Sequence, residues 1–162
     1  LLVSPVSPPV IILAKLVPYL LVGMINIVVI LLISVFILNV PIAGNIFLLF
    51  LVGTIFTLSS LALGIMVSVL TKTQRSAIII SIAGLMLPAI TLSGFIFPLG
   101  SLSLLMKVIV HLMPVTLFIS AARNIMIKGL GMDAVYPELF GLIVITVVLI
   151  VISIKCFKNR LS

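Results

Sequence analysis

The chain has 162 residues, of which 64% are hydrophobic and only 7% are charged, and its formal net charge is +7. A soluble domain carries about 25% charged residues because its surface faces water, so this composition excludes a soluble globular domain and favours a protein surrounded by lipid. The nine basic residues lie beside apolar runs and form no basic face interleaved with aromatic residues, so we expect no nucleic-acid partner.

The first two spans follow from a long run without charge between Lys15 and Lys72. At about 1.5 Å per residue, one helix over this run would reach roughly 84 Å, against about 30 Å of hydrocarbon. The run must therefore fold back, and its turn formers cluster at Asn39-Val40-Pro41 and Gly44-Asn45. We predict transmembrane helices over residues 16–38 and 46–70, preceded by a cytoplasmic segment over residues 1–15.

The polar sequence Thr71–Arg75 predicts a short loop over residues 71–76, followed by a third span over residues 77–97. Pro88 lies near the middle of this span, where its missing N–H predicts a kink or a break. A fourth span is predicted over residues 137–154, with Pro137 at the first helical position and a tail over residues 155–162.

Residues 99–136 fit a span poorly. The most apolar piece, between Lys107 and Arg123, has only 15 residues and contains His111 and Pro114. A piece of this length favours a re-entrant or interfacial segment. The predicted fold is therefore all-α: a polytopic helical membrane protein with four transmembrane helices and a re-entrant or interfacial helical segment between the third and the fourth.

Charge distribution predicts the orientation of these spans. Four spans put six basic residues on one side of the membrane: Lys15, Lys72, Arg75, Lys155, Lys158 and Arg160. The other side has three, Lys107, Arg123 and Lys128, with Asp133 and Glu138 beside them. Because basic residues favour the cytoplasmic side, both ends are predicted to be cytoplasmic, whereas a fifth span would place the basic tail outside.

The sequence offers little for catalysis. It has one histidine, one cysteine (Cys156), no cluster of metal ligands and no phosphate-binding glycine loop, so no catalytic, cofactor-binding or metal-binding residue is predicted. Ser93 and His111 could pair as in an intramembrane serine hydrolase, although nothing in the sequence orients the histidine as a base. No ionisable residue is predicted deep in a span, so energy for uphill transport is expected to enter from outside these spans.

Two groups of residues have open interpretations. Ser60, Gly64 and Ser68 form a stripe of small residues on the second span, for which helix packing is favoured over a substrate path. Arg123 and Lys128 are either solvated surface residues, or they steady a re-entrant helix at the membrane edge or attract anionic headgroups.

The chain resembles the C-terminal half of the transmembrane domain of a type-2 ATP-binding-cassette (ABC-2) transporter permease. The residues that carry the resemblance are Leu2-Val3-Ser4-Pro5-Val6, Lys72-Thr73-Gln74, Leu92-Ser93-Gly94-Phe95-Ile96-Phe97-Pro98, and Pro114-Val115-Thr116 with Arg123 and Lys128-Gly129. Together with the loop residues before the first span, they follow the family's order over nearly the whole chain. Because the chain begins with Leu1 and shows no signal peptide, we expect it to be the later part of a longer protein.

This resemblance implies a permease component of an ATP-driven exporter for drugs, lipids or polysaccharide, in a bacterial plasma membrane. Ser4, Pro5, Val6, Lys72 and Arg75 would contact a separate nucleotide-binding ATPase subunit, which would bind the ATP and Mg²⁺. Gly94, Pro98, Pro114, Arg123 and Lys128 would belong to the outer re-entrant region. A second permease copy would complete the pathway. A serine hydrolase and a non-transporting membrane scaffold are the alternatives.

Overall fold

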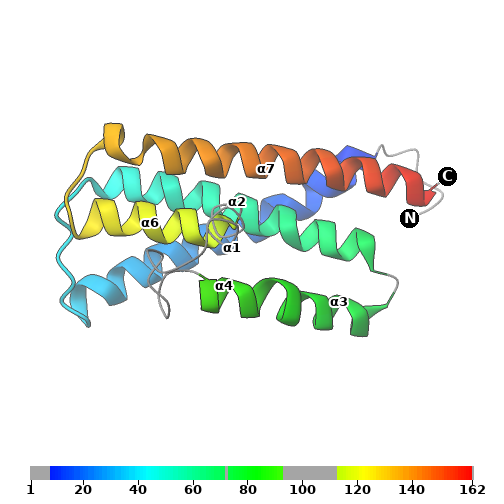
Figure 1. The fold of residues 1–162 in the computed structure, drawn as a ribbon, viewed down its shortest axis with the longest axis horizontal. Coiled ribbons are helices and arrows are strands. Elements are labelled where there is room, and N and C mark those ends of the chain that lie inside the picture. Colours follow the sequence, from blue (N-terminus) through cyan, green and yellow to red (C-terminus); the bar gives the residue numbers. More distant parts are fainter. Residues whose placement is uncertain (1–7, 72, 93–112, 162) are drawn as a thin grey trace.

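The computed structural model describes residues 8–71, 73–92 and 113–161, and the described residues are helical apart from short connections. The elements in chain order are α1 (Pro8–Phe36), α2 (Ile46–Leu70), α3 (Gln74–Ile80), the π-helical stretch η1 (Ser81–Met86), α4 (Leu87–Leu92), α6 (Pro114–Met126) and α7 (Met132–Leu161). Figure 1 shows them as an elongated bundle.

Four helical segments are long and apolar enough to cross a membrane: Leu16–Phe36, Ile46–Leu70, Gln74–Thr91 and Met132–Cys156. None of the third segment is buried inside the bundle. Apolar side chains left exposed on this scale need lipid or further helices around them. The prediction of an all-α, multi-pass membrane protein with four spans is confirmed.

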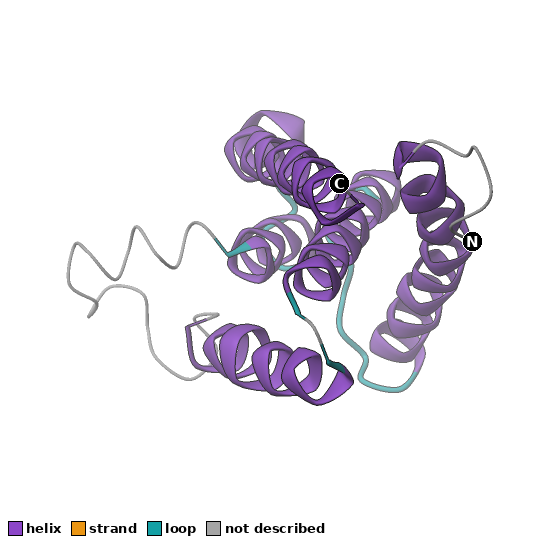
Figure 2. Ribbon diagram, turned by 90° about the vertical axis from the view of Figure 1, so that its right-hand side faces the viewer, coloured by secondary structure: helices purple, strands orange, loops and turns teal. Residues whose placement is uncertain are grey.

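The helices run side by side, so the connections collect at two ends of the bundle (Figures 1 and 2). The start of α1, the connection between α2 and α3 and the end of α7 lie at one end, on the right in Figure 1. The connections 37–45 and 127–131 lie at the opposite end. The first described residues of α1 and the end of α7 thus lie at the same end of the bundle, as the predicted even number of crossings requires.

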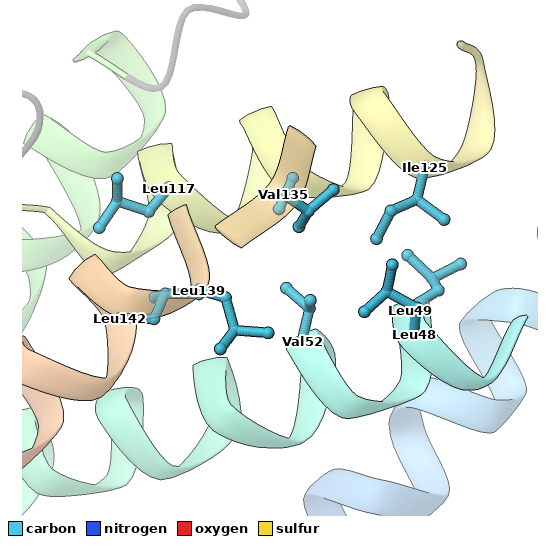
Figure 3. Close-up of a cluster of buried hydrophobic side chains, with 9 residues drawn as sticks. Leu48, Leu49, Val52, Leu117, Ile125, Val135, Leu139 and Leu142 are labelled. Atoms are coloured by element: carbon cyan, nitrogen blue, oxygen red, sulfur yellow. The ribbon is translucent and has the colours of Figure 1, made fainter. Parts of the chain in front are cut away.

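The packed core joins α2, α6 and α7. Figure 3 shows the apolar side chains of these three helices pointing toward one another. The core residues are Leu48, Leu49, Val52, Leu117, Ala121, Ile125, Val135, Leu139 and Leu142. Burying such side chains is the main favourable contribution to packing in water, whereas in lipid close contact between the side chains carries more of it.

The two connections at the far end of the bundle hold each other in place. Asn39 has φ 50° and Asn45 caps α2 by accepting the N–H of Phe47, which confirms that the chain reverses direction where its turn formers cluster. Ala43 donates its N–H to the carbonyl of Met126 at 3.0 Å. Gly129 has φ +64°, a conformation that glycine adopts without strain, and it ends the α6 helix beside Ala43.

Several predicted boundaries need correction. The last helix begins at Met132, so the prediction that Pro137 opens it is wrong. Val135 in its first turn is fully buried, and this packing extends the helix before the proline. The predicted loop at residues 71–76 is shorter, because Thr73 caps α3 and Arg75 already lies in that helix.

The irregularity predicted at Pro88 takes the form of a π-helical stretch. In an α-helix the ring of Pro88 would clash with the carbonyl four residues earlier. The preceding residues Ser81–Met86 form η1, in which the N–H of Leu87 reaches back to the carbonyl of Ile82. This wider turn keeps Gln74–Thr91 one continuous helical segment, with no break at the proline.

Of the predicted outer region 99–136, the structure describes residues 113–136, which comprise α6, the connection after it and the first turn of α7; α6 packs against α2 and α7. It has 13 residues, fewer than half of the 30 in α7, and it lies along the half of the bundle that contains the 37–45 and 127–131 connections (Figure 1). Whether α6 enters the membrane as a re-entrant helix or lies at its interface stays a prediction.

Candidate functional site

Three open cavities surround Ser60, which is exposed near the middle of α2. Cavity 1 has a volume of about 460 Å³ and lies between α2, η1, α4 and the start of α6. Its lining residues are Ser60, Leu63, Ser81, Leu85, Met86, Ala89, Met113, Pro114 and Val115. The π-helical stretch that adapts the chain to Pro88 therefore forms one wall of this cavity.

Cavity 2 has a volume of about 470 Å³ and lies between α1, α2 and α6. Phe56 and Phe118 stack with their ring centroids 4.4 Å apart and form part of its wall. Five polar side chains also line it: Tyr19, Asn26, Ser34, Thr57 and Ser60. The Thr57 hydroxyl donates to the carbonyl of Gly53 at 2.9 Å, so its donor is already used within α2.

Cavity 3, of about 340 Å³, lies over the stripe formed by Ser60, Gly64 and Ser68. A Cβ atom at Gly64 would meet nothing within 4 Å, and both serines are exposed. Within the described part of the chain no helix packs directly on Gly64, and packing on the stripe as a whole stays a prediction. The helix face that packs is the adjacent one, which carries Ser59 and Ala62.

The three cavities share one chemical character. Among the described residues that line them there is no aspartate, glutamate, lysine, arginine or histidine. Cavities of 300–1,000 Å³ with apolar walls and a few polar groups are typical of sites for small organic molecules. Such walls suit uncharged or amphipathic molecules, whose apolar parts they solvate and whose hydrogen-bonding groups meet a hydroxyl or an amide.

Two polar contacts join helices elsewhere in the bundle. Ser59 of α2 and Thr146 of α7 hydrogen-bond to each other in the buried interior, and both hydroxyls lie at the carbonyl of Leu142. About two turns earlier on α7, Glu138 accepts hydrogen bonds from Ser120 and Asn124 of α6. These contacts fix α7 against two neighbours.

The basic residues singled out in the sequence are exposed where the structure describes them. Arg75 lies in the first turn of α3, at the same end of the bundle as the end of α7 (Figure 1). Arg123 and Lys128 lie at the opposite end, in the last turn of α6 and the connection after it. Pro114 is buried at the first position of α6, where its missing N–H costs no hydrogen bond.

The remaining candidate residues fall outside the described ranges. They are Ser4, Pro5 and Val6 in the predicted coupling segment, Lys72 in the loop, Gly94 and Pro98 in the outer region, and the hypothetical pair Ser93 and His111. Within the described ranges, no group of three or more histidine, cysteine, aspartate or glutamate residues could hold a metal ion.

The sequence reading missed the roles of Glu138 and Ser59. In the sequence-based prediction Glu138 serves only as a charge on the outer side, although it is one of two acidic residues in the chain, and Ser120 and Asn124 stand one helical turn apart. A rare acidic residue and two hydrogen-bond donors one turn apart on a neighbouring helix are the pattern that could have predicted this contact. Ser59 had no such signal, because only its partner on α7 distinguishes it from Ser60.

Comparison with known proteins gives a consistent result. The family described as ABC-2 type transporter matches residues 1–127. The chain is 33% identical over 129 residues to the probable multidrug ABC transporter permease YbhS of Escherichia coli (strain K12), covering 80% of this chain and 34% of the relative. It is 32% identical over 146 residues to the probable multidrug ABC transporter permease YbhR of the same strain, covering 90% and 39%.

A eukaryotic relative, ABC transporter G family member 20 of Dictyostelium discoideum, is 32% identical over 151 residues, which cover 85% of this chain and 20% of the relative. The chain thus spans 34–39% of the length of the two bacterial relatives. No solved structure matches it.

Proposed function

This chain belongs to the ABC-2 type transporter family, and we propose that it forms part of the membrane-spanning permease of an ATP-driven exporter. The observation that carries the proposal is the family match over residues 1–127 on a bundle with four apolar spans. The names of the two bacterial relatives, both probable multidrug ABC transporter permeases, support a role in multidrug export.

The substrate class we propose is amphipathic and largely apolar. Cavities 1 and 2 lie at the middle of the bundle around Ser60, and their described walls carry no charge. Drugs and lipids have the apolar parts that such walls solvate. A lipid-linked polysaccharide would use the same walls for its lipid portion.

Energy would come from a separate nucleotide-binding subunit that holds ATP and Mg²⁺ and hydrolyses the nucleotide. The end of the bundle that contains Arg75 and the end of α7 carries most of the basic residues, which supports its assignment to the cytoplasm and to contact with that subunit. Ser4, Pro5, Val6 and Lys72 would share this contact. The permease part itself would have no catalytic role.

The opposite end would face outward. There α6, with Pro114 at its start and Arg123 near its end, would line the exit together with Gly94, Pro98 and Lys128. A second permease copy would complete the pathway, and the assembly would reside in a bacterial plasma membrane with both ends of this segment cytoplasmic.

The direct test is reconstitution of the full-length permease with its nucleotide-binding subunit in proteoliposomes. We expect ATP-dependent movement of the fluorescent amphipathic dye ethidium, or of a fluorescent phospholipid, across the bilayer. Vesicles with a subunit that binds but cannot hydrolyse ATP serve as the control. A complex that forms and hydrolyses ATP but moves neither probe contradicts the substrate class, and failure to bind any nucleotide-binding subunit contradicts the exporter itself.

The contact with the ATPase has a separate test. Arg75→Glu reverses the charge of an exposed residue at the proposed cytoplasmic end and should reduce co-purification of the nucleotide-binding subunit. Asp133→Lys is the matched control, because it reverses an exposed charge at the other end of the bundle. Equal co-purification of the ATPase with both variants would remove Arg75 from the proposed contact.

A further inference from the structure

The carboxyl group of Glu138 joins α7 to α6 through two consecutive turns of α6. Its Oε1 atom accepts a hydrogen bond from the Ser120 hydroxyl at 3.0 Å and another from the Asn124 amide at 3.2 Å. Within the described ranges, these are the only side-chain hydrogen bonds between α6 and α7. Because Oε1 accepts both hydrogen bonds, the Glu138 side chain ties two successive turns of α6 to one position on α7.

The second carboxyl oxygen gives this contact an unusual character. Oε2 of Glu138 is buried and has no hydrogen-bond partner. Buried polar atoms are normally paired, and an apolar side chain of similar size would fill the position without that cost. A carboxyl group at this position therefore contributes directional hydrogen bonds, which an apolar side chain cannot form.

The apolar contacts between α6 and α7 lack the directionality of hydrogen bonds. Leu117, Ala121 and Ile125 form the packed face of α6, and they meet an apolar face of α7 (Figure 3). Leu117 packs against Gly141 of α7, and after a shift of about one turn, ~5.4 Å, it would face the apolar residues Pro137 or Ile145 instead. The same shift would take Ser120 and Asn124 away from Glu138.

The position of α6 shapes cavities 1 and 2. Met113 just before α6, together with Pro114 and Val115 in its first turn, lines cavity 1. Phe118, Ala122 and Met126 line cavity 2. Any displacement of α6 along α7 would change both cavities at once.

We propose that Glu138 is a positioning residue that sets the register of α6 on α7, and through it the shape of both cavities. The effect on transport rests on the proposed function, whereas the register itself is independent of it. The two parts can therefore be tested by separate measurements on the same full-length protein.

The register is measured as a distance between two spin labels. One label is placed at Arg123→Cys on α6 and the other at Val147→Cys on α7, both at exposed positions, with Cys156→Ser removing the native thiol. Dilution with unlabelled protein restricts the signal to distances within one copy. The parent and Glu138→Gln, which keeps an acceptor oxygen for both donors, should give the same narrow distribution.

Glu138→Leu removes the acceptor and should broaden the distribution or shift it by up to about one helical turn, ~5 Å. The double variant Ser120→Ala with Asn124→Ala removes the donors and should do the same, and it decides the question if Glu138→Leu does not fold. Asp133→Asn, an exposed acid on the same helix, should leave the distance unchanged. A parent-like distribution in either the Leu variant or the double alanine variant overturns the proposal.

Transport provides the second measurement. In proteoliposomes, Glu138→Leu should raise the KM for ethidium severalfold while the ATP hydrolysis rate of the complex stays at the parent value, and Glu138→Gln should restore the KM. An unchanged KM in a variant whose label distance has shifted would overturn the link between register and cavities. Absence of ethidium transport by a parent complex that hydrolyses ATP would contradict the proposed substrate class alone and would leave the distance result standing.

Discussion

Ser59 of α2 and Thr146 of α7 hydrogen-bond to each other in the buried interior of the bundle, and this contact joins two apolar spans. Both side chains are almost fully buried. Thr146 also donates to the carbonyl of Leu142 at 2.6 Å, and the Ser59 hydroxyl lies 3.4 Å from the same oxygen. The polar atoms are thus satisfied inside the protein, as an apolar surrounding requires.

Removal of this contact should weaken the α2–α7 interface. Hydrogen bonds between membrane helices contribute about 0.6 kcal/mol on average, up to about 1.7 kcal/mol. We expect Ser59→Ala and Thr146→Val each to lower the free energy of unfolding by about this amount, as measured by denaturation of the full-length protein in detergent micelles. The double variant should cost less than the sum, because either substitution already breaks the bond.

Ser60→Ala is the matched control for Ser59→Ala, since Ser60 is exposed on the adjacent face of α2. Equal destabilisation by the two alanine variants would contradict the assignment of Ser59, and not Ser60, to the packed face.

Glycine 44 should be intolerant of a side chain. A Cβ atom there would lie 2.5 Å from the carbonyl oxygen of Ile125, which belongs to the backbone of α6 and cannot rotate away. Gly44→Ala should therefore push the 37–45 connection off α6 and lower the thermal unfolding temperature, with a cost of about 1–3 kcal/mol. Thermal unfolding followed by circular dichroism would measure it.

The contrasting variant is Gly64→Ala. No atom lies within 4 Å of the added Cβ, and alanine favours a helix over glycine by about 1 kcal/mol. We expect unchanged or raised stability. A loss as large as that of Gly44→Ala would mean that a further helix packs directly on Gly64.

The start of α3 should depend on its cap. The Thr73 hydroxyl accepts the N–H of Ser76 at 3.2 Å, and the Ser76 hydroxyl accepts the N–H of Thr73, which together form a capping box. Loss of an N-cap costs about 1 kcal/mol, so Thr73→Ala should speed amide hydrogen exchange at Ser76 by roughly fivefold. Gln74→Ala, next to the cap but outside it, should have little effect; equal acceleration would contradict the role of the box.

Filling cavity 2 should block transport by the intact assembly. Ala122 lines this cavity, and Ala122→Phe would place an aromatic ring in it. We expect lower ethidium transport with unchanged protein yield and unchanged binding of the nucleotide-binding subunit. Ala134→Phe adds the same ring at an exposed site and should transport normally; normal transport by both variants would exclude cavity 2 from the pathway.

The sequence was sufficient to place the spans because length and hydropathy determine what can cross a membrane. The helix α2, Ile46–Leu70, has the bounds predicted for the second span, because Asn45 and Thr71 flank it with polar side chains. The start of α7 differs from the prediction. The buried Val135 packs in the core with α6, so the helix begins before Pro137, the residue that was expected to open it.

Contacts between helices were harder to predict for a geometric reason. Ser59 and Ser60 are neighbours in sequence but point about 100° apart around α2, so which one packs depends on where α7 lies. The sequence indicates a stripe at Ser60, Gly64 and Ser68 from its regular spacing, and at Gly64 no atom lies within 4 Å of an added Cβ. Spacing identifies a face of a helix but does not identify its partner.

The even number of crossings underlies the whole account, and labelling of single cysteines tests it most directly. In full-length protein with Cys156→Ser, cysteines are introduced one at a time at Arg75, Lys128 and Lys155, all exposed, and intact cells are treated with a membrane-impermeant maleimide. We predict labelling of Lys128→Cys in intact cells, and labelling of Arg75→Cys and Lys155→Cys only after the membrane is permeabilised. Labelling of Lys155→Cys from outside, with Arg75→Cys protected, would contradict the four-span arrangement.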